Sequence, residues 1–255
     1  MSESENNPEV FWDKRASTFP RYSGLEDSYE VGMLNLARQN GIVFKGRRLI
    51  DIGCGSGLYT IGLALEAAEV TAVDISSEML AALRSEADRR GLKNIRYVHS
   101  NWLGFAGGEK YDVVFCSMSP AVRDEAGRIK MLEHAAGDVV YIGWGAPMKS
   151  DVAEGLYLKY GLNPPAMVDA PELRAWLDQK DLPYRHIPVS GRWKVKFTFD
   201  DIFGNCLNTL NNHGTAPDKN WLAGYLGQYE TSEGLYLETT DYEVEMILFT
   251  SNEKK

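Results

Sequence analysis

Short apolar runs alternate with segments of helical periodicity in the first part of the chain, between Arg48 and Trp144. Apolar residues three or four positions apart, such as Leu58, Ile61 and Leu65, predict the helices. The apolar runs predict strands at 48–52, 70–74, 95–99, 111–116 and 139–144. This alternation is typical of β-α-β units that build a mostly parallel sheet covered by helices on both faces.

The pattern is less regular after Gly145. Pro171, at a first helical turn, predicts a helix that carries Leu173 and Trp176. Strands are expected at 184–189, 193–199 and 242–250. The stretch 200–234 is rich in Asn, Gly and aromatic residues and is expected to be an insertion before the last strand, serving as a cover on the acceptor side of the site.

Composition narrows the class of protein. The chain has 255 residues, of which 44% are hydrophobic and 25% charged, as in ordinary globular proteins. A formal net charge of −9 argues against a nucleic-acid partner, which usually requires a basic face. The acidic start, the lack of an apolar stretch of about 18 residues and the lack of a C-x-x-C pair predict a cytoplasmic protein without membrane or metal.

A glycine-rich turn follows the first predicted strand, where residues 51–57 read Asp-Ile-Gly-Cys-Gly-Ser-Gly. At the carboxyl end of a strand, such a turn lets a ligand approach the backbone closely, and the next helix offers free N–H groups. A dinucleotide-binding fingerprint requires glycine at the sixth position counted from Gly53, which is Leu58 here. The turn therefore predicts a ligand site but disfavours NAD and FAD.

An acidic residue ends the second predicted strand. Asp74 lies about 20 residues after the turn, in position to accept hydrogen bonds from both hydroxyls of a ribose. Together with Asp51 and the glycine turn, it resembles the class I S-adenosylmethionine-dependent methyltransferase family. The first motif of that family runs acidic-x-Gly-x-Gly-x-Gly, and its second strand ends in Asp or Glu. The resemblance covers about residues 11–144.

The resemblance implies a fold. It is the doubly wound, Rossmann-like α/β fold, with a mostly parallel sheet of seven strands and an antiparallel last strand. We expect a single domain over 1–255. N-terminal lid helices would occupy 1–47, the cofactor-binding core 48–146, and the completion of the sheet, with the acceptor-side insertion, 147–255.

The resemblance also implies roles for individual residues. Gly53 and Gly55 would pass beneath the methionine moiety, and Ile75 and Met79 would line the adenine slot. Asn101 stands where the family usually has Asp, and its side-chain carbonyl can still accept a hydrogen bond from the adenine amino group. The implied cofactor-binding residues are Trp12, Tyr22, Asp51, Gly53, Cys54, Gly55, Asp74, Ile75, Met79, Asn101, Trp102 and Ser117.

Two further segments bear on the acceptor. Residues 11–16 and Arg21-Tyr22 resemble the lid helix of small-molecule methyltransferases, where aromatic rings can face the sulfonium, and Tyr22 is preferred over Trp12 for that position. Residues 116–120 read Cys-Ser-Met-Ser-Pro, at the lip where the donor methyl group meets the substrate. They lack the Asn-Pro-Pro-Tyr of amino-methylating nucleic-acid and protein-glutamine enzymes, which implies a small-molecule acceptor.

The expected reaction is in-line displacement of the sulfonium methyl group by a small-molecule acceptor, with S-adenosylhomocysteine as the product. It requires no protein nucleophile, and catalysis would come from alignment and exclusion of water. If the acceptor is a hydroxyl or an ammonium, a base would be needed, and Tyr22, His186 and His213 are the candidates. We expect a monomer or homodimer. Two alternatives are a non-catalytic S-adenosylmethionine-binding protein and a nucleotide-binding oxidoreductase.

Overall fold

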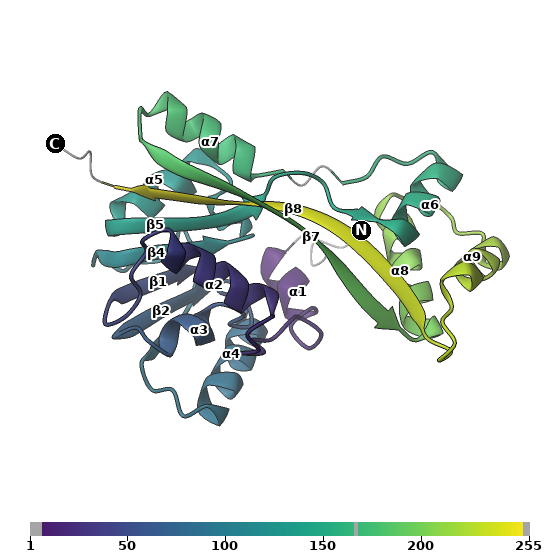
Figure 1. The fold of residues 1–255 in the computed structure, drawn as a ribbon, viewed down its shortest axis with the longest axis horizontal. Helices are drawn as coiled ribbons and strands as arrows, with labels where there is room; N and C mark the ends of the chain where they lie inside the picture. Colours follow the sequence, from purple (N-terminus) through teal and green to yellow (C-terminus); the bar gives the residue numbers. More distant parts are fainter. Residues whose placement is uncertain (1–6, 166–167, 252–255) are drawn as a thin grey trace. The chain divides into compact units, whose positions relative to one another are not determined.

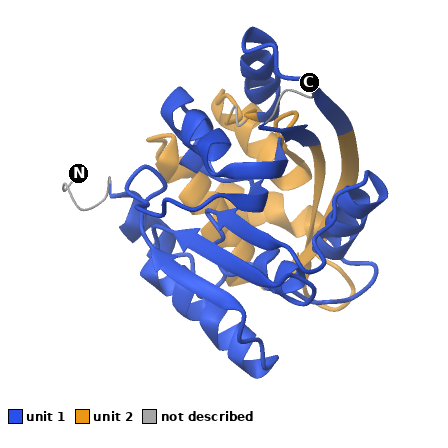
Figure 2. Ribbon diagram, turned by 90° about the vertical axis from the view of Figure 1, so that its left-hand side faces the viewer, with its two compact units in different colours: residues 1–143, 170–187, 246–255 blue, residues 144–169, 188–245 orange. Residues whose placement is uncertain are grey.

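The chain divides into two compact units (Figure 2). The computed structural model describes residues 7–165 and 168–251. Unit 1 comprises 1–143, 170–187 and 246–255, and unit 2 comprises 144–169 and 188–245. The single domain expected from the sequence stays a prediction.

Unit 1 is built on five parallel strands (Figure 1). They lie in the order β3-β2-β1-β4-β5, and β8 follows β5. The register pairs Ile52 with both Val73 and Cys116, so three strands end at one edge of the sheet. The strands are β1 (Arg48–Ile52), β2 (Glu69–Asp74), β3 (Ile95–His99), β4 (Tyr111–Ser117), β5 (Ala135–Trp144) and β8 (Tyr236–Thr250).

Helices cover both faces of this sheet. On one face, Ile50 and Ile52 of β1 share an apolar cluster with residues of α5 and α7. On the other face, Ala72 of β2 packs with Ile61 of α3 and Leu83 of α4. Successive residues of a strand point to opposite faces, so both faces of these strands are buried, as in a doubly wound sheet. The helical elements of unit 1 are α1 (Pro8–Asp13), α2 (Tyr29–Gln39), α3 (Thr60–Ala64), α4 (Ser77–Arg89), η2 (Pro120–Val122), α5 (Glu125–Glu133) and α7 (Ala170–Gln179).

Unit 2 has its own apolar core. Ile202, Cys206 and Leu210, on one face of α8, pack with Leu156 of α6 and Leu222 of α9. The strand β6 pairs antiparallel with β8. The elements of this unit, besides parts of β7 (Tyr184–Phe197) and of β8, are β6 (Lys149–Ser150), α6 (Asp151–Tyr160), α8 (Phe199–Asn212), α9 (Lys219–Leu226) and η3 (Gly227–Tyr229).

The expected fold class is confirmed: the strands form a mostly parallel sheet with an antiparallel strand. The sheet has eight strands rather than seven, because the two-residue β6 adds one. The expected strands in the first part of the chain agree with β1 to β5 within a few residues. The helix after Ser76 is also confirmed, since the Ser76 Oγ accepts a hydrogen bond from the Met79 N–H at 3.1 Å.

One expectation about the second part of the chain was wrong. The strands expected at 184–189 and 193–199 are one strand, β7. Gly191 lies inside this strand. A Cβ on Gly191 would overlap the hydroxyl of Tyr242 and lie 2.6 Å from its Cζ, so this glycine allows an aromatic ring to approach the strand. The segment 200–234 precedes the last strand, as expected, and it is mostly helical.

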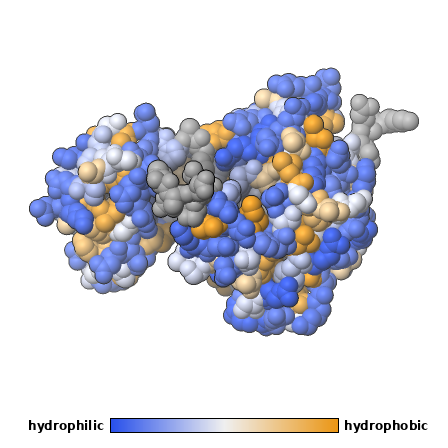
Figure 3. Space-filling model, turned by 180° about the vertical axis from the view of Figure 1, so that it is seen from behind, coloured by the Kyte–Doolittle hydropathy of each residue, from blue (hydrophilic) through white to orange (hydrophobic). Residues whose placement is uncertain are grey.

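Most of the molecular surface seen in Figure 3 is hydrophilic, and apolar residues gather there only in small groups. This agrees with a chain in which acidic residues exceed basic ones and the net charge is −9. Within residues 7–165 and 168–251, none of the helices has the length and apolar character needed to cross a membrane.

Candidate functional site

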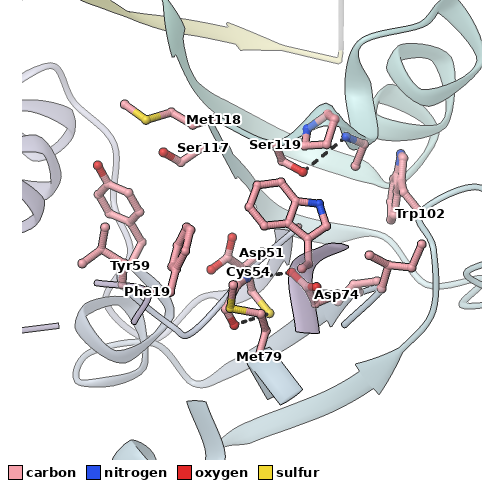
Figure 4. Close-up of a pocket in the computed structure, with 18 of the residues that line it drawn as sticks. Phe19, Asp51, Cys54, Tyr59, Asp74, Met79, Trp102, Ser117, Met118 and Ser119 are labelled. Carbon is pink, nitrogen blue, oxygen red and sulfur yellow. Dashed lines mark hydrogen bonds between the residues drawn. The ribbon is translucent and has the colours of Figure 1, made fainter. Parts of the chain in front are cut away.

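A pocket of about 340 Å³ lies at the shared edge where β1, β2 and β4 end (Figure 4). Its size is within the usual range for small-molecule sites. All the residues that line it belong to unit 1. Every cofactor-binding residue predicted from the sequence lines this pocket, with the exception of Tyr22.

The glycine turn forms the floor of the pocket. Gly53, Gly55 and Gly57 have φ angles of +68°, +53° and +88°, which favour glycine. A Cβ on Gly53 would overlap the Ser119 Oγ and lie 2.7 Å from its Cβ. The N–H groups of Gly53 and Cys54 donate to the carbonyl of Val73 at 2.8 and 3.1 Å, which holds the turn against β2.

Asp74 is buried at the end of β2 and holds the turn from the other side. Its Oδ2 accepts a hydrogen bond from the Gly55 N–H at 2.7 Å, and its Oδ1 accepts one from the Ser76 N–H at 2.8 Å. Burial raises the pKa of this carboxyl, although the two hydrogen bonds oppose the rise. A carboxylate has about four lone-pair sites, so Asp74 can still accept bonds from a ligand in the pocket.

Asp51 supplies a second buried carboxylate at the end of β1. Its Oδ2 accepts a hydrogen bond from the Thr60 hydroxyl at 2.6 Å. The pKa of Asp51 is raised to about 7. Burial is the largest cause of the rise, the Thr60 hydrogen bond opposes it, and the charge of nearby Asp74 adds to it. A cationic ligand group beside Asp51 would offset this cost of burial.

Helix α1 is tied to the pocket by a side-chain cap. The Asp13 carboxylate accepts from the Ser76 hydroxyl at 2.6 Å and from the Glu78 N–H at 3.2 Å, at the start of α4. A carboxylate at a helix N-terminus is favourable. Trp12, next to Asp13, therefore lines the pocket, where its ring meets that of Phe19 edge-on at 6.0 Å.

The side of the pocket toward β3 has the expected flat walls. Met79 and Trp102 line it, and both are buried. The Trp102 indole donates to the carbonyl of Gly127 at 3.0 Å, so this residue serves the core and the pocket together. The Asn101 Oδ1 accepts from the Gly104 N–H at 2.7 Å, which leaves one lone pair for a ligand.

The lip after β4 has a strained backbone. Met118 has a φ of +49°, an uncommon value for a residue with a side chain. Its N–H donates to the carbonyl of Ile142 at 2.7 Å, which ties the lip to β5. Ser117, Met118 and Ser119 all line the pocket. Strain of this kind is often found at ligand sites.

The three candidate bases are not brought to the pocket. Tyr22 is buried in the core: its ring lies against the guanidinium of Arg90, at 5.0 Å, and over Gly62, and it does not line the pocket. His186 lies on β7 and His213 caps the end of α8 beside the ring of Tyr157. Neither histidine lines the pocket.

Sequence reasoning missed three aromatic residues that line the pocket: Phe19, Tyr29 and Tyr59. Tyr59 is only 6% exposed, and its ring is 5.1 Å from that of Phe115. The available signal was its position directly after the glycine turn, at the start of a helix. Phe19 follows the aromatic pair Phe11-Trp12 in the predicted lid segment.

The chemistry of the pocket fits S-adenosylmethionine. This ligand has an adenine ring, a ribose and two cationic groups, the sulfonium and the ammonium. Two buried carboxylates line the pocket, and no Lys, Arg or His stands among its lining residues in the described part of the chain. The glycine turn leaves room for close approach, and Met79 and Trp102 offer flat apolar walls.

Comparison with known proteins gives the same result. A family model described as a methyltransferase domain matches residues 49–137. The chain is 32% identical to the ubiquinone biosynthesis O-methyltransferase of Yersinia pestis over 180 residues, which cover 63% of this chain and 73% of the relative. It is 29% identical to the enzyme of that name from Cronobacter sakazakii, with the same coverage.

Solved structures agree on the fold. The YcgJ protein from Bacillus subtilis superposes with a TM-score of 0.56 at 16% identity, over 88% of this chain and 99% of that protein. The N-methyltransferase NodS from Bradyrhizobium japonicum, solved with S-adenosylhomocysteine, gives 0.55 at 13% identity, over 97% of this chain and all of NodS. With the identity and coverage of the Yersinia pestis relative, these findings show that the chain belongs to the family of S-adenosylmethionine-dependent methyltransferases.

Proposed function

We propose that this chain methylates a hydroxyl oxygen of a small, uncharged acceptor. The observation that carries the choice of oxygen is the similarity, at 32% identity, to enzymes named O-methyltransferases. The lip supports an uncharged acceptor, because Ser117, Met118, Ser119, Pro120 and Ala121 line that end of the pocket and none of them is charged.

In this proposal, each part of the pocket binds one part of the cofactor. Asp51 pairs with the ammonium, Asp74 accepts from the ribose hydroxyls, and Gly53 and Gly55 pass beneath the methionine moiety. Ile75, Met79, Asn101 and Trp102 hold the adenine. When bound, S-adenosylmethionine supplies an electrophilic methyl group. Trp12 and Phe19, which line the pocket and whose rings contact each other, exclude water from it.

In this proposal none of the described side chains that line the pocket acts as a general base, since Asp51 is paired with the ammonium of the cofactor. Burial and the nearby charges of Asp51 and Asp74 raise the pKa of the Cys54 thiol well above its usual value, so this residue stays protonated. Asp74 is held by two backbone N–H groups. The transfer forms the oxygen–methyl bond, breaks the sulfur–methyl bond to give S-adenosylhomocysteine, and releases the hydroxyl proton of the acceptor to water. The chain acts by positioning the acceptor in line with the methyl group, which alone can supply a large part of a rate enhancement.

The test of the acceptor is a transfer assay with labelled methyl donor and a bacterial small-molecule extract, with products identified by mass spectrometry. We expect labelled methyl ethers with the wild-type chain and none with Gly53→Ala, in which the floor of the pocket is blocked. Label found only in methylated amines would contradict oxygen as the accepting atom. Tight donor binding without any labelled product would favour the alternative of a non-catalytic binding protein.

Cofactor affinity is expected to depend on pH through Asp51. Its pKa of about 7 means that, below pH 7, it must lose a proton before it can pair with the ligand ammonium. The affinity for S-adenosylhomocysteine should therefore fall by up to about tenfold per pH unit below 7 and level off above it. Calorimetric titration from pH 5.5 to 8 measures this. In Asp51→Asn the slope should disappear, and an unchanged slope would remove Asp51 from this role.

Other expectations stay predictions. The segment 200–234 is proposed to help bind the acceptor, and its apolar residues in α8 also build the core of unit 2, so deleting it would unfold that unit. Cytoplasmic location, a monomeric or homodimeric state and the lack of a nucleic-acid partner rest on the sequence alone.

A further inference from the structure

Tyr59 presents a buried hydroxyl to the pocket. The residue is 6% exposed and lines the pocket. The hydroxyls of Ser117 and Tyr29 lie near the Tyr59 hydroxyl, but among the described residues none forms a hydrogen bond of good geometry with it. A buried hydroxyl without a partner costs free energy, on the order of 1–3 kcal/mol. Such a group is retained more readily where a ligand supplies the missing partner.

The surroundings of Tyr59 make it a donor. Burial raises the pKa of its phenol well above the ordinary value, the nearby Tyr29 raises it further and the Ser117 hydroxyl opposes the rise, so the Tyr59 hydroxyl keeps its proton. In Figure 4 the Tyr59 hydroxyl points toward the end of β4, where Ser117 and Met118 lie. The missing partner is therefore an acceptor atom of a ligand on the β4 side of the glycine turn.

The cofactor has one anionic group, the carboxylate of its methionine moiety. The two carboxylates of the pocket suit the ammonium and the ribose, and no cationic side chain is among the described lining residues. The ligand carboxylate must therefore be met by neutral donors. The hydroxyl of Ser100 is already engaged as a donor, to the carbonyl of Asn101 at 2.8 Å.

We propose that the Tyr59 hydroxyl donates a hydrogen bond to the carboxylate of the cofactor's methionine moiety, beside the hydroxyls of Tyr29 and Ser117. This inference rests on the proposed placement of the cofactor. It makes the carboxylate subsite a neutral one, built from hydroxyl groups. Arg21 is a rival donor, because its Nη1 is buried without a hydrogen-bond partner among the described residues, yet Arg21 does not line the pocket.

The test compares two ligands that differ only in the carboxylate. S-adenosylhomocysteine and its decarboxylated analogue, which keeps the ammonium and the adenosine, are titrated calorimetrically into the wild type, Tyr59→Phe, Arg21→Gln and Tyr22→Phe. We expect Tyr59→Phe to lower the affinity for S-adenosylhomocysteine by about tenfold to a hundredfold, since a hydrogen bond to a charged group is lost. The affinity of Tyr59→Phe for the decarboxylated analogue should differ from that of the wild type by less than about twofold. Tyr22→Phe removes a hydroxyl from a buried tyrosine outside the pocket and should leave the affinity for both ligands unchanged.

The other outcomes are distinct. If Tyr59→Phe lost affinity for both ligands equally, or lost affinity for neither, the assignment would be overturned. A loss specific to the carboxylate in Arg21→Gln but not in Tyr59→Phe would give the subsite to Arg21. If the wild type bound neither ligand, the proposed placement of the cofactor itself would fail. Thermal unfolding of each variant confirms that it is folded.

Discussion

Gly53→Ala is expected to lower the affinity for S-adenosylhomocysteine by about a hundredfold or more, which corresponds to about 2.7 kcal/mol of binding free energy. Two physical effects act together. The φ of +68° is unfavourable for alanine, and the added Cβ would overlap the Ser119 Oγ at the lip of β4. Gly53 belongs to the floor of the pocket and Ser119 to its lip. Relief of the overlap must therefore move one of these two parts of the pocket. Calorimetric titration with S-adenosylhomocysteine measures the loss.

Gly91→Ala is the matched control. Gly91 has a φ of +70°, close to that of Gly53, but a Cβ there would meet nothing within 4 Å. The control therefore carries the backbone strain without the overlap, at the end of α4 and away from the pocket. It should lower the melting temperature slightly and leave the affinity unchanged. If Gly53→Ala bound the ligand as tightly as Gly91→Ala, the turn would not be the floor of the site.

Asp74→Ala should weaken the binding of S-adenosylhomocysteine by about 1–3 kcal/mol, which lowers the affinity by about tenfold to a hundredfold. The structure gives two reasons. The ribose would lose a charged acceptor, and the N–H groups of Gly55 and Ser76 would lose the partner that fixes the turn. The loss should appear in the dissociation constant measured by calorimetry, at a pH above 7 where Asp51 is ionised.

Asp88→Ala removes the same charge from an exposed site and is the control for Asp74→Ala. Asp88 lies on α4 and pairs only loosely with Lys93, at 3.5 Å, so its loss should leave the affinity within about twofold. A folded Asp74→Ala variant with an unchanged dissociation constant would take Asp74 out of the cofactor site.

Most residues that line the candidate site could be predicted from the sequence, because the features that mark them are local. The glycine turn and Asp74 each stand at the end of a strand, and parallel strands bring their carboxyl ends to one edge. The register of Ile52 with Val73 and Cys116 fulfils that expectation. The resemblance to the methyltransferase family implied the places of Met79 and Trp102, and both residues line the pocket.

Contacts between distant segments could not be predicted in this way. Tyr22 and Trp12 are both aromatic residues of the N-terminal segment, and composition does not tell which ring faces the pocket. The bond of Asp13 to Ser76, 63 residues away, turns Trp12 toward it, and Tyr22 packs against Arg90 instead. The sequence also gave His186 and His213 no identifiable partner, so nothing located them in space.

The continuity of β7 also depends on contacts between distant segments. Gly191 lies inside this strand and makes room for the ring of Tyr242, which is 51 positions away in the chain. The apolar pattern around Gly191 does not contain that contact, so two strands were expected where there is one.

The central claim is that the pocket at the ends of β1, β2 and β4 binds the methyl donor, and a crystal structure of the chain with S-adenosylhomocysteine tests it most directly. The account predicts density for the ribose at Asp74, for the adenine between Met79 and Trp102, and for the amino-acid tail above Gly53. Density for the ligand at another place on the chain, with this pocket filled only by solvent, would contradict it.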